Sequence, residues 1–249
     1  MGNPFGRLIL ITGRKAAAAL AESRVIVVGI GGVGSWCAEA LVRSGIGSIT
    51  LVDPDVVCTS NVNRQIQATN STIGRKKTEA LEERLLDINP SCHIVSFPCA
   101  FTKETMDSFD ISGADFVIDA IDMLTQKLDL IEAAYSAGKK LFSSMGMAQK
   151  LQPTLIRTAD IWETKGCPLA RLVRQGLKKR NFSGHFTAVY SPEKLSRRED
   201  AIEPDEPASP AGWESGKKVI NGSAVTVTAT AGMVLASLVI QDICAGTGG

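Results

Sequence analysis

Gly29-Ile-Gly-Gly-Val-Gly-Ser35 follows the apolar run 25–28 directly and precedes a segment with helical character at 36–43. A buried strand, a glycine-rich turn and a helix start place free backbone N–H groups and the positive helix end where a phosphate can bind. Gly31 and Gly32 let a ligand approach the backbone, and Gly34 lets the helix pack closely on the strand. The stretch predicts a nucleotide site, but alone it does not distinguish a dinucleotide cofactor from ATP.

Strand-like and helix-like segments alternate on both sides of this stretch. We expect strands at 24–28, 48–53, 93–98, 115–119 and 140–144, and helices at 15–22, 32–43, 74–88, 102–109 and 124–137. Such alternation is typical of α/β proteins. It predicts a Rossmann-like, mainly parallel sheet with helices on both faces.

The pattern becomes less regular after residue 147. We expect an extended segment at 154–158, a basic helix at 168–180, a strand at 186–190 and a long proline-containing loop at 191–218. A chain of 249 residues, 44% of them hydrophobic, can form one full core. We therefore expect one domain, with a nucleotide-binding half at about 1–150 and a C-terminal substrate-side extension at about 151–249.

The cysteines and the apolar segments indicate the cellular compartment in which the protein is expected. Six cysteines stand at positions 37, 58, 92, 99, 167 and 244, without a Cys-x-x-Cys pair or a Cys/His cluster. This favours a reducing, cytoplasmic environment and argues against structural zinc. The start of the chain lacks the features of a signal peptide. Residues 219–240 carry no charge, but hydroxyl side chains interrupt them, so we expect a strand or loop leading into a buried helix rather than a membrane span.

Two acidic residues follow the second expected strand. Asp53 ends that strand about twenty residues past the glycines, where an acceptor for ribose hydroxyls belongs in NAD and ATP sites alike. The alternative is a strand-end acid that caps a loop. Asp55 lies two residues further on, so both carboxylates can line the same rim.

Basic residues in the next loop favour ATP. Arg64 lies in Thr59-Ser-Asn-Val-Asn-Arg-Gln65, and Lys77 ends Gly74-Arg-Lys-Lys77 at a helix start. A dinucleotide enzyme has no need for these cations, whereas the further phosphates of ATP require charge neutralisation. We assign Arg64 and Lys77 to the triphosphate; the alternative for each is an ordinary solvated charge.

A third acidic motif, Asp119-Ala-Ile-Asp122, ends the fourth expected strand. Open α/β sheets bind ligands at this carboxyl edge. Because Mg²⁺ is usually held by one or two carboxylates and phosphate oxygens, we take Asp122 as the metal ligand. Asp119 is expected to belong to the strand end and its hydrogen bonds.

Together these residues resemble the ThiF/MoeB-type, ubiquitin-activating-like adenylating enzymes. The matching motifs are Gly29 to Ser35, Asp53-Pro-Asp55, Ser60-Asn61 with Arg64-Gln65, Gly74 with Lys77, and Asp119-Ala-Ile-Asp122. The resemblance implies that ATP activates a carboxylate as an acyl-adenylate with release of pyrophosphate, in a homodimer or pseudodimer. It also implies a cofactor-binding set of Gly29, Gly31, Gly32, Gly34, Asp53, Asp55, Asn61, Arg64 and Lys77.

A second set of residues narrows the resemblance: Val27 to Trp36, Asn63-Arg-Gln-Ile66, Val117 to Asp122, Pro153-Thr154, Pro168-Leu-Ala170 and Thr228-Ala-Thr230. On these residues the chain most resembles the tRNA threonylcarbamoyladenosine dehydratase branch of that family, over about 13–230. That similarity implies adenylation of the threonylcarbamoyladenosine carboxylate in tRNA and cyclisation with loss of water, with Arg64, Lys77 and Asp122 as catalytic residues. No thioester is required, so we expect Cys167 to be an ordinary buried cysteine. The alternative is an adenylyltransferase that activates the C-terminal Gly-Gly of a sulfur-carrier protein. An NAD-dependent oxidoreductase is a further alternative, against which Arg64, Lys77 and Asp122 speak.

A basic segment at 165–198 is the candidate tRNA contact, since a net charge of +1 for the whole chain offers no global attraction. The segment contains nine positively charged residues and one acidic residue, Glu193. The positively charged residues are Lys165, Arg171, Arg174, Lys178, Lys179, Arg180, Lys194, Arg197 and Arg198. The alternative is a solvated helix face balanced by the acids at 199–206. Phe182, His185, Phe186 and Tyr190 lie beside the cations, and either base stacking or core packing accounts for them.

Overall fold

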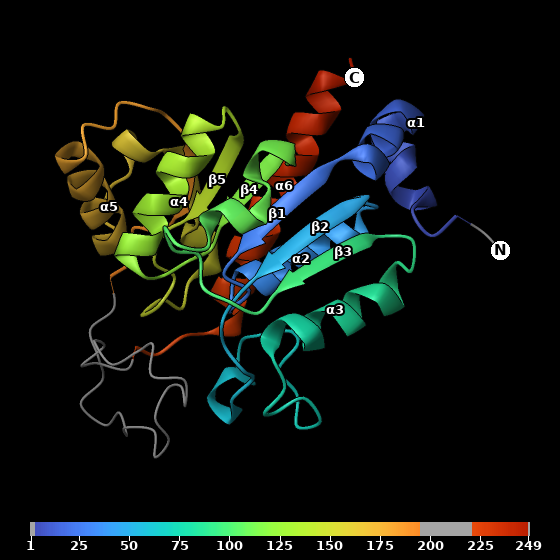
Figure 1. Cartoon of the computed structure of the whole chain (residues 1–249), viewed down its shortest axis with the longest axis horizontal. Coiled ribbons are helices and arrows are strands. Elements are labelled where there is room, and N and C mark those ends of the chain that lie inside the picture. The colour runs from blue at the N-terminus through green and yellow to red at the C-terminus, as the bar shows by residue number, and fades with distance from the viewer. Residues whose placement is uncertain (1–2, 195–220, 249) are drawn as a thin grey trace.

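The computed structural model describes residues 3–194 and 221–248, which form a layered α/β structure around one sheet (Figure 1). The sheet has seven strands in the order β3-β2-β1-β4-β5-β7-β6. Its strands are β1 (Arg24–Val28), β2 (Ser48–Val52), β3 (His93–Phe97), β4 (Phe116–Asp119), β5 (Lys140–Ser144), β6 (Arg157–Asp160) and β7 (Thr187–Tyr190). All neighbouring pairs are parallel except β6 and β7. The Rossmann-like, mainly parallel sheet predicted from the sequence is confirmed.

Helices cover both faces, and β1 shows why. Val25 and Val27 point into one apolar cluster, whereas Ile26 and Val28 point into the other. The first cluster lies under α2 (Gly34–Arg43), α3 (Lys77–Ile88) and α6 (Val225–Gly246), and the second under α4 (Leu124–Ser136) and α5 (Pro168–Lys179). A strand that is apolar on both faces therefore requires helices on both sides.

Several element boundaries differ from the predicted ones. The first helix, α1 (Gly6–Glu22), begins well before residue 15 and is broken at Gly13, where φ is 81°. The helix predicted at 102–109 is only a 3₁₀ turn, Met106–Phe109, and α3 begins at Lys77 rather than at 74. Gly74 has a φ of 86°, which keeps the chain out of the right-handed helix there. The expected extended segment at 154–158 is a 3₁₀ turn, Pro153–Leu155, followed by β6.

The apolar C-terminal region forms the long helix α6. Of the described helices, α6 has the length and apolar composition of a membrane-crossing helix. In this structure it lies against α2, and residues such as Val227, Ala231 and Leu235 are fully buried. A Cβ atom on Gly232 would be 2.4 Å from the Val33 carbonyl oxygen, so the two helices approach very closely. This agrees with the expected loop leading into a buried helix. Most of the loop predicted at 191–218 lies outside the described residues.

Candidate active site

The site lies where the strand order reverses. From β1 the chain passes to β2 on one side, and β4 flanks β1 on the other. The loops that follow β1 and β4 touch there, because a Cβ atom on Gly29 would be 2.8 Å from the Ala120 carbonyl oxygen. Gly29 also has a φ of 84°, which favours glycine. Open α/β sheets bind ligands at such a reversal point, at the carboxyl edge of the strands.

The glycine-rich loop presents backbone donors at this edge. Within residues 3–194 and 221–248, the N–H groups of Gly31, Gly32 and Val33 have no hydrogen-bond partner. A Cβ atom on Gly34 would be 1.9 Å from the Gly29 carbonyl oxygen, so the helix start packs directly on the strand end, as predicted. Around Gly31, in contrast, the nearest atom to a Cβ placed on that residue would be 3.8 Å away. The loop combines a tight helix start with unused N–H groups, which is the arrangement that binds phosphates.

Asp53 is buried under this loop. Its Oδ2 accepts a hydrogen bond from the Ile30 N–H at 2.9 Å, and its Oδ1 accepts one from the Asp55 N–H at 3.0 Å. Burial raises the pKa of Asp53, against the opposing effect of the Lys77 charge. The structure thus shows the loop-capping alternative for Asp53. Its oxygens retain lone pairs, so the ribose contact stays a prediction.

Lys77 forms the positive centre of a buried cluster. Its Nζ lies 2.7 Å from Asp55 Oδ2 and 3.8 Å from Asp53 Oδ1, and only 5% of the residue is exposed. Burial alone would lower the pKa of Lys77, but the two carboxylates outweigh it and the pKa is raised. Lys77 is therefore a fixed ammonium group beside the glycine-rich loop.

Arg64 lies against the glycine-rich loop. Its Cγ would be 3.2 Å from a Cβ atom on Gly32, and its carbonyl oxygen accepts a hydrogen bond from Trp36 Nε1 at 3.0 Å. Its Nη1 donates to the Ser60 carbonyl and to Asn63 Oδ1, at 2.7 and 2.9 Å. The positive charge of Arg64 acts to lower the pKa of Lys77, against the stronger effect of the two carboxylates.

Asn61 is a buried residue of the turn that carries Arg64. Its Oδ1 accepts a hydrogen bond from the Cys58 N–H at 3.1 Å, and its carbonyl oxygen accepts one from the Arg64 N–H at 3.0 Å. The structure places Asn61 as a support for Arg64. Direct contact between Asn61 and a nucleotide remains a prediction.

Two residues of the Asp119-Ala-Ile-Asp122 motif have different environments. Asp122 is exposed in the loop between β4 and α4. Asp119 is fully buried: its Oδ2 lies 2.6 Å from Lys127 Nζ and accepts a hydrogen bond from Ser143 Oγ at 2.5 Å. The expected strand-end role of Asp119 is confirmed. Sequence reasoning missed Lys127, although it shares a helical stripe with the buried Ile131 and Ala134.

The start of α6 also borders the site, which sequence reasoning missed. Asn63 Nδ2 donates to the Ser223 carbonyl at 2.9 Å, and Thr228 Cβ would be 3.3 Å from a Cβ atom on Gly32. The Gln149 N–H donates to the Gly222 carbonyl at 2.8 Å. A chain of contacts thus joins the segment after β5, the start of α6 and Arg64.

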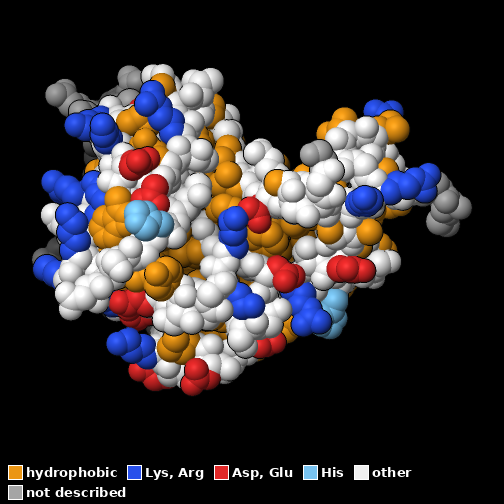
Figure 2. Space-filling view, turned by 90° about the horizontal axis from the view of Figure 1, so that it is seen from above, with side chains coloured by type: hydrophobic (Ala, Val, Ile, Leu, Met, Phe, Trp, Pro, Cys, Tyr) orange, Lys and Arg blue, Asp and Glu red, His pale blue; other side chains and the backbone are white. Residues whose placement is uncertain are grey.

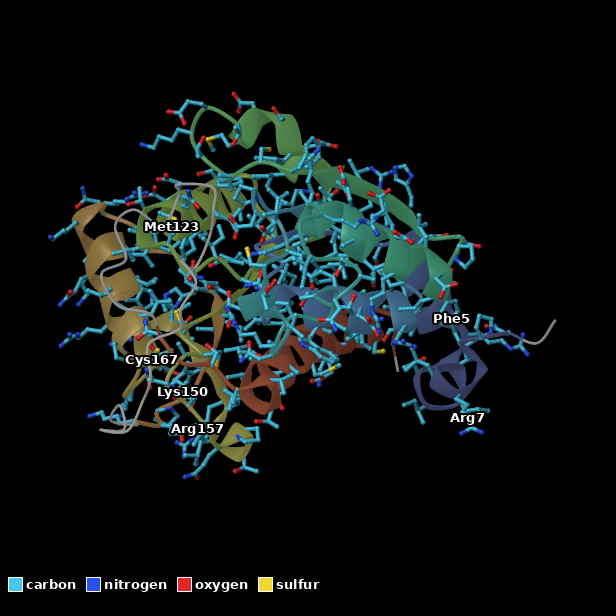
Figure 3. All side chains as sticks on the ribbon, turned by 90° about the horizontal axis from the view of Figure 1, so that it is seen from below. Phe5, Arg7, Met123, Lys150, Arg157 and Cys167 are labelled. Carbon is cyan, nitrogen blue, oxygen red and sulfur yellow. The ribbon has the colours of Figure 1, made fainter. Side chains whose placement is uncertain are left out.

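The segment that follows β5 lies against the start of α5 at the carboxyl edge of the sheet. Lys150 is buried and its Nζ donates to the Glu193 carbonyl at 2.7 Å, while the Glu193 carboxylate accepts from the N–H groups of Leu151 and Gln152. Figure 3 shows Lys150, Cys167 and Met123 near α5, with Phe5 and Arg7 at the opposite end of the molecule on and beside α1. Cys167 is buried in the cluster under α4 and α5, as expected for an ordinary core cysteine.

The fit of the predicted magnesium ion depends on Asp122. No group of three or more His, Cys, Asp or Glu side chains suited to a metal occurs in the described part of the chain. Mg²⁺ needs only one or two carboxylates when substrate phosphates supply the remaining oxygens. The exposed Asp122 carboxylate at the reversal point fits that donor set.

Comparison with known proteins agrees with this geometry. A family model described as the ThiF family matches residues 5–245. The chain belongs to the ThiF family. Among ThiF-family proteins, the tRNA threonylcarbamoyladenosine dehydratase of Bacillus subtilis (strain 168) is 37% identical over 98% of this chain and 95% of that protein. The dehydratase of Escherichia coli (strain K12) is 36% identical over 97% and 93%.

A solved ThiF-family structure is also similar. It is the crystal structure of E. coli tRNA N6-threonylcarbamoyladenosine dehydratase, TcdA, in complex with ATP. The TM-score is 0.83 at 34% identity, and the match covers 98% of this chain and 94% of that chain. The structural similarity therefore extends over nearly the whole chain.

The basic segment of this ThiF-family chain is only partly available as a surface. Lys165, Arg171, Lys178, Lys179 and Lys194 are exposed, and Arg197 and Arg198 lie outside the described residues. Arg174 donates to Thr164 Oγ1. Arg180 Nη1 lies 2.6 Å from both Asp129 Oδ1 and Glu132 Oε2. Arg174 and Arg180 therefore have structural partners, while the exposed face of α5 remains basic. The acids at 199–206, which the solvated-face alternative invokes, lie outside the described residues.

Proposed function

We propose that this protein is an ATP-dependent tRNA-modifying enzyme. It adenylates the carboxylate of threonylcarbamoyladenosine in tRNA and cyclises that group with loss of water. The observation that carries the proposal is the gathering of the unused loop N–H groups, Arg64, Lys77 and Asp122 at the reversal point of a ThiF fold. Similarity to dehydratases over nearly the whole chain supports this choice of substrate.

The residues have distinct tasks in this proposal. The N–H groups of Gly31, Gly32 and Val33 bind phosphate oxygens, and Asp53 and Asp55 line the ribose side. Arg64 and Lys77 stabilise the negative charge that develops when the substrate carboxylate attacks the α-phosphate and pyrophosphate leaves. Asp122 holds Mg²⁺, which neutralises phosphate charge.

Ring closure needs few further groups. Once the carboxylate carries AMP, a neighbouring atom of the same modified base attacks the activated carbonyl and AMP departs. Because both reacting groups belong to one nucleoside, the site has only to hold them in contact, which makes the step effectively unimolecular. The buried Cys167 has no part in it.

We also propose that the protein acts as a cytoplasmic homodimer. Leu10 and Ile11 on α1 are 85% and 82% exposed, and large apolar side chains at that exposure favour a contact with a second copy. All six cysteines are free, which suits a reducing compartment. Size-exclusion chromatography with light scattering would test the dimer, and a Leu10→Ser, Ile11→Ser variant should shift it to monomer.

The decisive experiment incubates the purified protein with ATP, Mg²⁺ and tRNA that carries threonylcarbamoyladenosine. We expect AMP release together with loss of one water mass from the modified nucleoside. The alternative, a sulfur-carrier activator, predicts ATP–pyrophosphate exchange stimulated by a carrier ending in Gly-Gly and not by tRNA. Exchange with the carrier and none of the cyclic product would overturn the proposal.

A further inference from the structure

A cavity of about 530 Å³ opens at the amino ends of the strands, where β5 and β7 begin. Four aromatic side chains and a histidine contribute to its lining: Tyr135, Phe142, Phe182, Phe186 and His185. The adenylation site uses the carboxyl edge, so this cavity is separated from it by the length of the strands. No step of the proposed reaction uses it.

Among the aromatic side chains of the cavity, Tyr135 is exposed, Phe182 is partly buried, and Phe142 and Phe186 are buried. The rings of Tyr135 and Phe182 meet edge to face with centroids 4.9 Å apart, and Tyr135 is 53% exposed. A Cβ atom on Gly184 would be 2.4 Å from the Tyr135 ring and 2.6 Å from the Phe182 ring, so the backbone at Gly184 packs closely against both rings. Trp162 Nε1 donates to the Gly184 carbonyl at 2.9 Å and holds that loop in place. Such a wall offers a flat ligand a prepared stacking surface.

Polar groups at the rim suit a nucleotide. His185 Nδ1 lies 3.0 Å from Asp160 Oδ2, which orients the ring, and the His185 side chain is 73% exposed. Lys139 and Lys140 also line the cavity. Lys140 Nζ pairs with Asp242, and no ion pair engages Lys139 among the residues described. An imidazole can hydrogen-bond a base edge, and an ammonium group can neutralise a phosphate.

Helix α5 runs from the segment that follows β5, at the carboxyl edge of the sheet, toward this cavity. It begins at Pro168, next to Cys167 on the side of Lys150, and ends at Lys179, three residues before Phe182. Its twelve residues span about 18 Å. Arg171, Lys178 and Lys179 are exposed along it. Figure 2 shows Lys and Arg side chains gathered along one side of the molecule, beside exposed hydrophobic side chains and a histidine.

We propose that this cavity binds an unstacked nucleotide of the substrate tRNA. The base stacks on Tyr135, its phosphate faces Lys139, and the RNA backbone follows the basic face of α5 to the adenylation site. The inference rests on the proposed function, since it assumes a tRNA substrate. Charge and ring chemistry favour RNA over a peptide tail, because a Gly-Gly terminus has neither aromatic groups nor a row of negative charges.

The test compares Tyr135→Ala, Tyr135→Phe and a control, Leu86→Ala, which removes a partly exposed apolar side chain from α3. The dissociation constant for modified tRNA is measured by fluorescence anisotropy at one salt concentration, and the ATP dissociation constant is measured beside it. We expect Tyr135→Ala to weaken tRNA binding by about 5- to 30-fold, with ATP binding unchanged. Tyr135→Phe and Leu86→Ala should match the wild type. Ultraviolet cross-linking should attach tRNA to a peptide that contains Tyr135 or Phe182.

Each outcome separates the two proposals. Unchanged tRNA affinity in Tyr135→Ala overturns the cavity assignment, even if the wild type forms the cyclic product. Cross-linking of free AMP to the cavity in competition with tRNA also overturns it, in favour of a site for a free nucleotide. Tyrosine-dependent tRNA binding without AMP release in the wild type supports the cavity assignment and overturns only the proposed reaction.

Discussion

Lys127 Nζ and Asp119 Oδ2 lie 2.6 Å apart, and both side chains are fully excluded from solvent. The pair links the start of α4 to the end of β4, directly before the loop that carries Asp122. Ser143 Oγ and the Ser144 carbonyl complete the shell around the ammonium group, at 3.3 and 2.9 Å. The buried ion pair therefore holds the end of β4 and the start of α4 together, on either side of the loop that carries Asp122.

Lys127→Met should strongly destabilise the protein. The substitution leaves the Asp119 carboxylate buried without its counter-charge, which costs about 3–5 kcal/mol. Urea unfolding followed by circular dichroism measures the loss. Lys140→Met is the matched control, because Lys140 pairs with Asp242 on the surface and its loss should cost less than about 1 kcal/mol. Equal losses of unfolding free energy in the two variants would contradict the stabilising role assigned to the buried Lys127–Asp119 pair.

Two glycine substitutions should separate folding from nucleotide binding. Gly34→Ala places a methyl group on the Gly29 carbonyl oxygen, so the backbone must shift and we expect a loss of more than about 2 kcal/mol. Gly31→Ala has space within the protein and should change stability by less than about 1 kcal/mol. It should nevertheless raise the KM for ATP, because the methyl group would lie where we propose that a phosphate group approaches the loop. A Gly31→Ala enzyme with a normal KM for ATP would show that no phosphate group of ATP lies against the Gly31 backbone.

Lys77→Met should abolish most activity. It removes the cation that we propose stabilises the phosphates and leaves the carboxylates of Asp53 and Asp55 without their ammonium partner, so we expect AMP formation to fall by about 100-fold or more. The neighbouring Lys76→Met is the control, since Lys76 is half exposed and pairs with the exposed Glu79. Single-turnover AMP release under saturating ATP is the measurement. A Lys77→Met variant as active as Lys76→Met would remove Lys77 from the catalytic set.

Asp122→Asn should change the magnesium dependence of the reaction. An amide binds Mg²⁺ less well than a carboxylate, so the half-saturating Mg²⁺ concentration should rise by about 10-fold or more. Asp107→Asn, an exposed acid on the 3₁₀ turn Met106–Phe109, serves as the control. The rate of AMP release is measured as a function of Mg²⁺ concentration at fixed ATP. An unchanged titration curve for Asp122→Asn would mean that the ion has another ligand.

Glu39 should give stability a specific dependence on pH. Burial alone would raise the pKa of Glu39, but hydrogen bonds from Arg84 and Arg43 outweigh it and the pKa is lowered. The stabilisation is present above the unfolded-state pKa of about 4.3 and is lost as pH falls through the lower folded-state value. Glu39→Gln should therefore flatten the fall in unfolding free energy below about pH 5. A Glu39→Gln variant with the wild-type acid slope would disprove this linkage.

Local motifs explain why much of the site was predictable. The glycine-rich loop, Asp53, Arg64 and Lys77 lie within one stretch of sequence and are brought together by two neighbouring strands and their loops. The positive φ at Gly29 and the close packing at Gly34 are possible because glycine lacks a Cβ atom. Both features could therefore be predicted from the residue type alone.

Long-range contacts explain what was missed. Asn63 meets the Ser223 carbonyl across 160 positions, and no local pattern indicates that pairing. Strand β7 lies next to β5 and β6 forms the sheet edge, so chain order does not match sheet order there. Likewise, Lys127 resembles a surface residue by type and becomes a buried ion only because Asp119 and Ser143 surround it.

The contact between Gly232 and the Val33 carbonyl has a consequence for biosynthesis. During translation, β1, the glycine-rich loop and α2 leave the ribosome nearly two hundred residues before the middle of α6. Until α6 emerges, the apolar side of α2 lacks its main covering helix and Asn63 lacks its contact with Ser223. A nascent or truncated chain that ends before α6 therefore exposes hydrophobic surface to chaperones and proteases. The glycine-rich loop, made early, therefore reaches its final surroundings only after α6 has been made.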